Sequence, residues 1–203
     1  MIRDLDDTLA QLLRSRAPAG SELAAATISF DLPDAQWRAG LEALTVNCYL
    51  YDIRENKALR TNERPIQRSA DLSRAIRRRA PVRIDCAYCI TAWSPATDES
   101  ILEEHRLLGQ VLRVLLRHPT IPSSVLQGDL VDQIPPYPTV IASAEGVKNQ
   151  PEFWGALDQQ LKPSLNYVVT LVMSIDDSPS DAQMLPVVDE VAVGVDDMSR
   201  SGS

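Results

Sequence analysis

The chain has 203 residues, of which 44% are hydrophobic and 24% charged, as in an ordinary folded domain with its own core. Its apolar runs are only a few residues long, so we expect no membrane insertion. The first residues, MIRDLDDTLAQLL, carry acids among the leucines, whereas a signal peptide has a basic start and an uninterrupted apolar stretch. We therefore expect a cytoplasmic protein whose three cysteines are reduced.

Charge is unevenly distributed along the chain. The net charge is −8, which argues against a general nucleic-acid binder. Residues 54–83 nevertheless contain ten Lys or Arg against three Asp or Glu, and residues 176–203 contain seven Asp or Glu against one Arg. This asymmetry predicts contact between the two segments or between subunits.

The first third of the chain predicts one helix and two strands. Leucines at helical spacing, with acids in the first turn, predict a helix over residues 2–14. A strand is expected over 25–30. The segment TVNCYLYDI, residues 45–53, is apolar on both faces and is therefore expected in the middle of a sheet. Residues 58–79 are polar and rich in Arg, and we expect a short edge strand followed by a mobile loop.

The middle of the chain predicts a long strand and the strongest helix. The strand covers residues 82–93, and the helix covers about 98–118 and ends at Pro119. We expect the helix to bury one stripe, widened by Leu107, Val111 and Val114. That stripe consists of Leu102, His105, Leu108, Leu112 and Leu115.

The last part of the chain alternates short elements with prolines. A helical turn is expected at Val125–Leu126, a strand at 139–143, a helix over 151–161 and a central strand over 165–175. We expect one α/β (α+β) domain over residues 1–175, with a mixed β-sheet flanked by helices. Its boundaries are set by composition: a linker over 176–185 and a C-terminal arm over 186–203, containing a terminal strand and a disordered end.

Cys86 and Cys89 form a C-x-x-C that lies within the strand expected over 82–93. Reactive C-x-x-C pairs stand at a helix N-terminus, where the helical turn brings the sulfurs together. In a strand, residues three apart point to opposite faces and their α-carbons are ~10 Å apart. That is beyond the ~7 Å limit for a disulfide. We expect two small buried apolar residues and neither a redox nor a metal site.

Other motifs of catalysis are missing from the sequence. There is no G-x-S-x-G, no G-x-G-x-x-G and no phosphate-binding G-x-x-x-x-G-K. His105 lies in a helix without a second histidine four residues away, and His118 stands before Pro119, where a helix-capping role fits. We expect no catalytic residue, no bound metal and no cofactor.

Two segments are candidates for an assembly interface. The arginine-rich segment has no aromatic residue between 54 and 83, so it lacks a platform for base stacking, and a solvated loop or a protein partner is favoured over nucleic acid. The segment PVVDEVAVGV near the C-terminus predicts a strand that either folds back or adds to the sheet of another subunit. The candidate interface residues are Arg60, Arg64, Arg68, Arg74, Arg77, Arg78, Arg79, Val187, Val188, Val191, Val193 and Val195.

Five stretches in series give the sequence a family resemblance over about residues 1–176. They are MIRDLDDTLAQLLR, TVNCYLYDIRENKALR, PVRIDCAYCITAWS, DESILEEHRLLGQVLRVLLRHPTIP and LKPSLNYVVTLVMSI. In this order they resemble the tail-terminator, or cap, proteins of extracellular contractile injection systems, which are phage-tail-like particles made by bacteria.

The resemblance implies a structural protein without catalytic residues. Such caps form a homo-hexameric ring on the end of the inner tube and sheath away from the baseplate, where they stop polymerisation and fix the length. The expected partners are other copies of the chain and the sheath or inner-tube proteins, within a particle assembled in the cytoplasm. The alternative within this class is another structural ring, such as a tube or connector ring. A thiol or metal enzyme and a nucleic-acid binder are the rivals from other classes.

Overall fold

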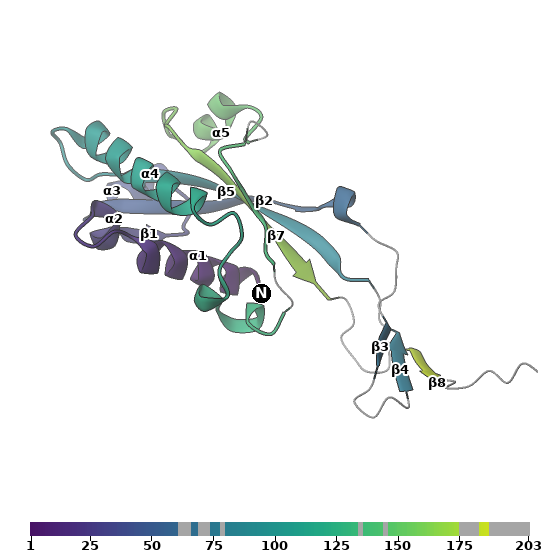
Figure 1. Ribbon diagram of the computed structural model, residues 1–203. Helices are drawn as coiled ribbons and strands as arrows, with labels where there is room; N and C mark the ends of the chain where they lie inside the picture. Colours follow the sequence, from purple (N-terminus) through teal and green to yellow (C-terminus); the bar gives the residue numbers. More distant parts are fainter. Residues whose placement is uncertain are drawn as a thin grey trace, which may run out of the picture. The chain divides into compact units, whose positions relative to one another are not determined.

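A five-stranded mixed sheet with helices on both faces forms the larger part of the protein (Figure 1). The structure is a computed structural model and describes residues 1–60, 66–68, 74–77, 80–133, 136–143, 146–174 and 183–186. Two compact units divide the chain. The first comprises Met1–Arg60 and Val82–Met173, and the second comprises Thr61–Pro81 and Ser174–Ser203.

The sheet of the first unit has the strand order β1-β2-β5-β7-β6. Only the edge strand β1 is parallel to its neighbour, and every other pair is antiparallel. The long strands β2 and β5 pair along most of their length, with an irregularity between Leu50 and Asp52. The strands are β1 (Thr27–Ser29), β2 (Thr45–Glu55), β5 (Val82–Trp93), β6 (Thr139–Ile141) and β7 (Leu165–Met173).

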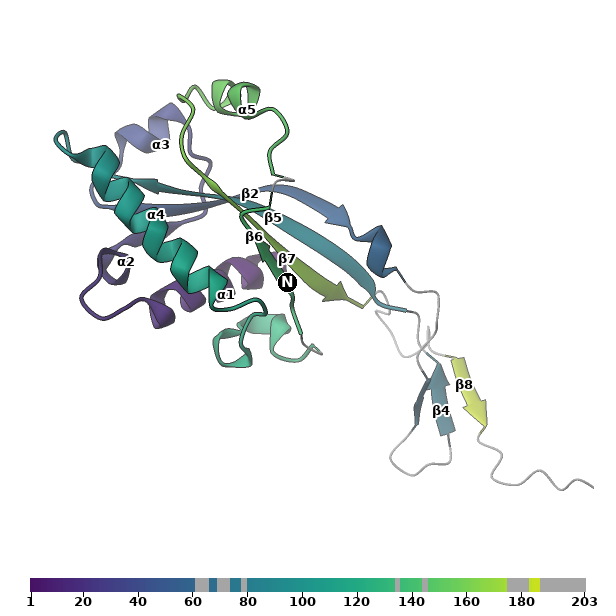
Figure 2. The same cartoon turned by 45° about the horizontal axis from the view of Figure 1, so that its top comes forward.

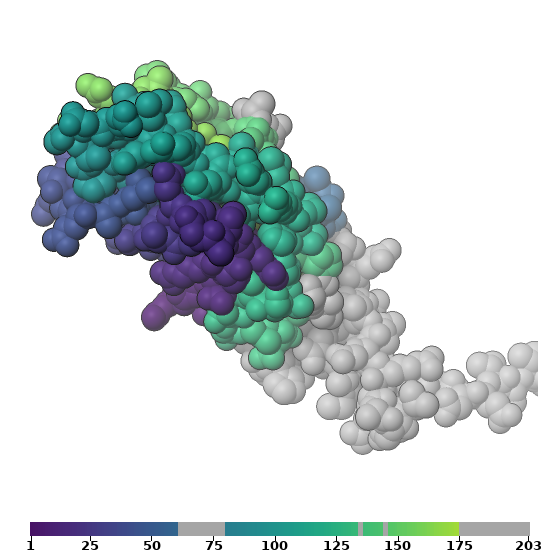
Figure 3. All heavy atoms as spheres, turned by 60° about the vertical axis from the view of Figure 1, so that its left-hand side comes forward, coloured from purple at the N-terminus to yellow at the C-terminus, as the bar shows by residue number. Residues whose placement is uncertain are grey.

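Helices α1 (Ile2–Arg16), α2 (Glu22–Ala25) and α4 (Ser100–Leu116) cover one face of the sheet (Figure 2). Their apolar side chains pack against the inward-facing residues of β2, β5 and β7 to form the main core. Two 3₁₀ turns, Ser123–Val125 and Gly128–Leu130, extend this layer beside α1. Figure 3 shows α1, α4 and the segment after α4 as one continuous surface.

The opposite face is covered at one end by α3 (Ala35–Ala39) and α5 (Gln150–Ala156). An aromatic cluster joins them, in which the rings of Trp37 and Trp93 meet edge to face at 5.4 Å. Lys162 pairs with Glu104 and also lies 4.4 Å from the centre of the Trp93 ring. Burial lowers the pKa of Lys162, against the opposing effect of Glu104. This ion pair is largely shielded, so loss of either partner would leave a poorly solvated charge.

The second unit contains a three-stranded antiparallel sheet in the order β3-β4-β8. Its strands are β3 (Ile66–Arg68), β4 (Arg74–Arg77) and β8 (Gln183–Pro186). The strand β8 begins inside the segment that composition marked as a linker over 176–185. A strand was expected within 58–79, but β4 was not, because the weak periodicity of this segment did not separate two strands.

Most predicted elements of the first unit are present with shifted ends. The helix expected over 151–161 stops at Ala156, and the strand expected over 25–30 shortens to β1, with Ser21 capping α2 before it. Helix α3 was not predicted, although Asp34 caps it by accepting a hydrogen bond from the Trp37 amide at 2.7 Å. Two 3₁₀ turns replace the single turn expected at Val125–Leu126.

The predicted buried stripe of α4 was only partly right, because Leu115 is buried as expected but the stripe as a whole is centred on other residues. Leu102 is 57% exposed, and His105 is exposed as well. The buried positions are Leu107, Val111, Val114 and Leu115, so the residues expected to widen the stripe are its centre. Leucines occur all around this helix, and packing against α1 and the sheet selects the face that is buried.

This register predicts a sharp contrast between two leucine truncations. Leu107→Ala removes a fully buried side chain and should lower the free energy of unfolding by about 2–5 kcal/mol. Leu102→Ala, the matched control on the same helix, should change it by less than about 0.5 kcal/mol. Urea denaturation followed by circular dichroism measures both. Equal losses in the two variants would contradict the observed packing of α4.

Candidate assembly surfaces

The arginine-rich segment and the C-terminal segment meet within one chain. β4 pairs with β8, so that Arg74 lies opposite Pro186 and Arg77 opposite Gln183. Arg68 ends β3, and Arg60 is an exposed residue that pairs with Glu55 at 3.5 Å. The contact predicted from the charge asymmetry is therefore present as backbone pairing. The remaining candidate interface residues lie outside the described residues: Arg64, Arg78, Arg79, Val187, Val188, Val191, Val193 and Val195.

The C-x-x-C lies in mid-strand as the sequence predicted. Cys86 belongs to the main core beneath α1 and α4, whereas Cys89 belongs to the aromatic cluster beneath α5. All three cysteines are free and buried. Burial raises the pKa of the Cys86 thiol and of the Cys89 thiol to about 11, and raises that of Cys48 as well. These thiols therefore act as small apolar residues.

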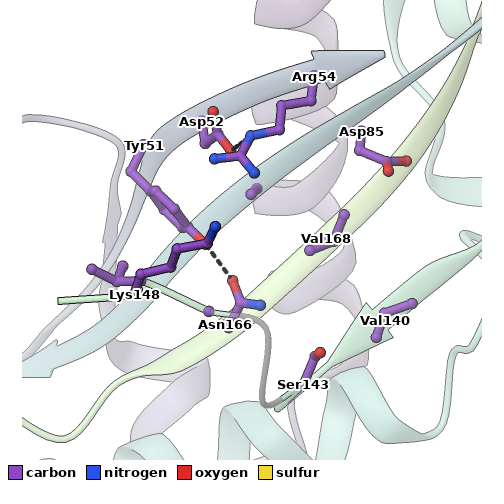
Figure 4. Close-up of a pocket in the computed structure, with 12 residues that line it drawn as sticks. Tyr51, Asp52, Arg54, Asp85, Val140, Ser143, Lys148, Asn166 and Val168 are labelled. Atoms are coloured by element: carbon purple, nitrogen blue, oxygen red, sulfur yellow. Dashed lines mark hydrogen bonds and ion pairs between the residues drawn. The ribbon is translucent and has the colours of Figure 1, made fainter. Parts of the chain in front are cut away.

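A polar groove lies on the part of the sheet that α5 leaves open (Figure 4). Its volume is about 1010 Å³. Strands β2, β5, β7 and β6 form its floor, and the loop Gly146–Lys148 borders it. A β-carbon added at Gly146 would lie 3.3 Å from the β-carbon of Asn166, so this loop approaches β7 closely.

The two carboxylates that line the groove, those of Asp52 and Asp85, both have partners. Asp52 and Arg54 form an ion pair at 2.5 Å. The Asp85 carboxylate accepts hydrogen bonds from the side-chain amide of Asn56 at 3.0 Å and from the Thr170 hydroxyl at 2.7 Å. Because these carboxylates already have partners, the arrangement resembles a recognition surface more than a pair of catalytic acids.

Tyr51 and Asn166 both line the groove and are hydrogen-bonded to each other. The Tyr51 hydroxyl donates to Oδ1 of Asn166 at 2.8 Å, and burial raises the pKa of Tyr51. The amide nitrogen Nδ2 of Asn166 is buried and has no hydrogen-bond partner in the part of the chain that the structure describes. This groove was not predicted from the sequence, because its residues come from four strands and a loop that are far apart in the chain.

The described part of the chain also bears on metal binding, membrane insertion and the two histidines. No group of three or more metal-ligating side chains occurs among those residues. No helix among them is long and apolar enough to cross a membrane. His105 is exposed, and His118 follows Arg117, the C-cap of α4, with its backbone amide donating to the Leu115 carbonyl at 3.0 Å.

The fold matches that of two solved tail terminators. The sheath/tube terminator of an extracellular contractile injection system, PVC, in its extended state matches with a TM-score of 0.67 and 23% identity, over 100% of this chain and 65% of that chain. The tube-terminating cap of the anti-feeding prophage matches with a TM-score of 0.66 and 24% identity, over 96% of this chain and 62% of that chain. At these identities the similarity establishes the fold, and the chain spans less than two thirds of either structure.

The family follows from the sequence. The family described as the Pvc16 N-terminal domain matches residues 4–189, so the chain belongs to this family. The expected fold and the resemblance to tail terminators are thus confirmed. Among curated proteins, none matches the chain. The structural neighbours are structural caps rather than enzymes.

The cysteine environments predict inert thiols. With a raised pKa, the thiolate fraction of Cys86 and of Cys89 is small at pH 8, and burial blocks access to the sulfur atoms. Native protein should therefore react with a disulfide reagent at well under one thiol per chain, and protein in urea should react at all three cysteines. Rapid reaction of Cys86 and Cys89 in the native protein would contradict this prediction and would support a redox site at the C-x-x-C.

Proposed function

We propose that this protein is the structural cap of a bacterial contractile injection particle. A ring of copies, six by the family resemblance, binds the end of the inner tube and sheath away from the baseplate and ends their polymerisation. The particle is assembled in the cytoplasm. The single observation that carries this proposal is the fold, which matches a sheath/tube terminator and a tube-terminating cap along essentially the whole chain.

The physical need for such a cap comes from helical growth. Each added ring of sheath exposes the same heterologous surface, so assembly has no built-in end. A terminator must bind that surface and present no copy of it on its outer side. The chain has two compact units, to which we assign different roles. The first unit forms the ring, and the second contacts a neighbouring subunit.

The C-terminal segment, residues 187–203, is the part of the chain that we propose contacts a neighbouring subunit. Its valines need a partner sheet, and the arm could add to a sheet edge of a sheath subunit or of an adjacent copy by β-augmentation. Its acidic residues would steer it toward a basic neighbouring surface. The strand β8, which precedes this segment, is paired with β4 of the same chain, so the proposed contact between subunits is assigned to the residues after Pro186.

Particle length tests the cap function directly. Electron microscopy of particles from cells without this gene should show lengths that become variable or excessive, or no particles at all. Cells with the gene restored should give uniform particles. Uniform particles in its absence would contradict the proposal. Labelling of a tagged chain along the whole particle, rather than at one end, would favour the alternative of a tube or connector ring.

Removal of the C-terminal segment should weaken capping without unfolding the chain. A deletion of residues 187–203 retains β8, whereas a deletion from residue 176 would also remove a strand of the second sheet. The shorter deletion should broaden the distribution of particle lengths while the melting temperature stays near that of the full chain. The matched control deletes only residues 199–203. Unchanged lengths after deletion of 187–203 would remove the arm from the mechanism.

A further inference from the structure

The outer edge of β2 lacks a neighbouring strand over most of its length. β1 pairs only with Thr45–Asn47, while β5 follows the other side of β2 as far as Glu55. Within the described residues, no strand lies beside the outer edge from Cys48 to Glu55. Figure 2 shows the far half of β2 at the margin of the sheet.

The backbone groups at this edge are directed outward at two positions. The amide of Asn56 donates to the carbonyl of Arg83 at 2.8 Å, which makes these two residues a hydrogen-bonded pair. Hydrogen-bonded pairs alternate with unbonded pairs along an antiparallel ladder. Ile53, opposite Cys86, and Glu55, opposite Ile84, are therefore unbonded positions, and their N–H and C=O groups point away from β5.

The edge carries only part of the usual protection against strand addition, in the form of three charged side chains and one irregularity. Charged side chains, prolines and bulges commonly block an edge. Here Arg54 is paired with Asp52 and Glu55 with Arg60, which neutralises the local charges. No proline occurs in β2, and the irregularity between Leu50 and Asp52 leaves the segment after it straight enough to pair with β5. Ile53 is 47% exposed, so an apolar side chain is offered on one face of the edge.

We infer that the outer edge of β2 receives the C-terminal segment of a second copy as an added strand. The chain continues for 17 residues beyond Pro186, the last described residue, and the sequence of that stretch begins VVDEVAVGV. In an extended strand one face carries four valines and one acid, and Glu190 stands on the other face. The residues of the first face are Val187, Asp189, Val191, Val193 and Val195. With the valines against Ile53, Glu190 takes the face of Arg54, whose side chain is 67% exposed.

A second copy is a suitable partner because the strand that is added and the edge that receives it are different surfaces of the chain. Each copy offers one C-terminal segment and one open edge, so the contact is heterologous and repeats from copy to copy until it closes as a ring. This inference rests on the proposed function, since it names the partner of the C-terminal segment within the ring.

Substitutions at Ile53 test the backbone part of the contact. Ile53→Pro removes an N–H that points away from β5, so the sheet itself loses no hydrogen bond. It should weaken self-association by about tenfold or more, measured by sedimentation velocity over a range of concentrations. Ile53→Ala, the matched control, keeps the N–H and should weaken it less. Self-association equal to that of the unmodified chain in Ile53→Pro would overturn the inference.

Cross-linking identifies the two partners without depending on stability. Chains carrying Ile53→Cys are mixed with tagged chains carrying Val191→Cys, and mild oxidation should link tagged to untagged chains, because the native cysteines are buried. Val187→Cys and Val195→Cys give the register. A link that forms only within single chains carrying both cysteines, or no link at all, would contradict a second-copy partner. Particle lengths are measured separately in cells that carry these variants. If the contact is lost but the lengths stay uniform, the inference fails while the proposed cap function is not contradicted.

Discussion

The central strand β5 has to be covered on both faces, and the rest of the first unit is arranged around that requirement. Cys86, Tyr88 and Ile90 face the helices α1 and α4, and Cys89 and Trp93 face α5 and α3. From Cys86 to Trp93 both faces of this strand are buried, which requires a layer of side chains on each side of the sheet. Small residues at 86 and 89 let both helical layers approach the sheet, which is the role that the C-x-x-C serves.

Coverage of the second face is incomplete, and that has structural consequences. α5 is short and reaches only the end of the sheet near Cys89 and Trp93. Beyond it the same face carries a mixture of charged and small apolar residues, such as Asp85, Ala87 and Val168, and no aromatic cluster covers them. Paired charges such as Asp52 and Arg54 make this open face compatible with water while it has no partner. The groove is therefore what remains when a sheet is longer than the helices available to cover it.

How much of this could be predicted from sequence depends on the range of the interactions involved. The central strands were predictable because β2, β5 and β7 carry apolar residues on both faces, which is a local pattern. The buried face of α4 was not, since leucines surround that helix and only its contact with α1 decides between Leu102 and Leu107. The groove depends on the register between β2, β5 and β7, which no local pattern contains. Pairing of β4 with β8 was foreshadowed only by charge, over a separation of about a hundred residues.

The arrangement of strand edges bears on how such a chain could end an assembly. One edge of the large sheet is partly closed by its own chain, because Thr139 on β6 donates to Pro119 at 2.9 Å. The other edge is closed by β1 over three residues, and no strand among the described residues continues along the rest of β2. A subunit with two open edges would propagate strand pairing in both directions. A subunit with one open edge and one separate strand-forming segment can satisfy its neighbours around a ring and still present no repeated surface along the axis, which is the property that termination requires.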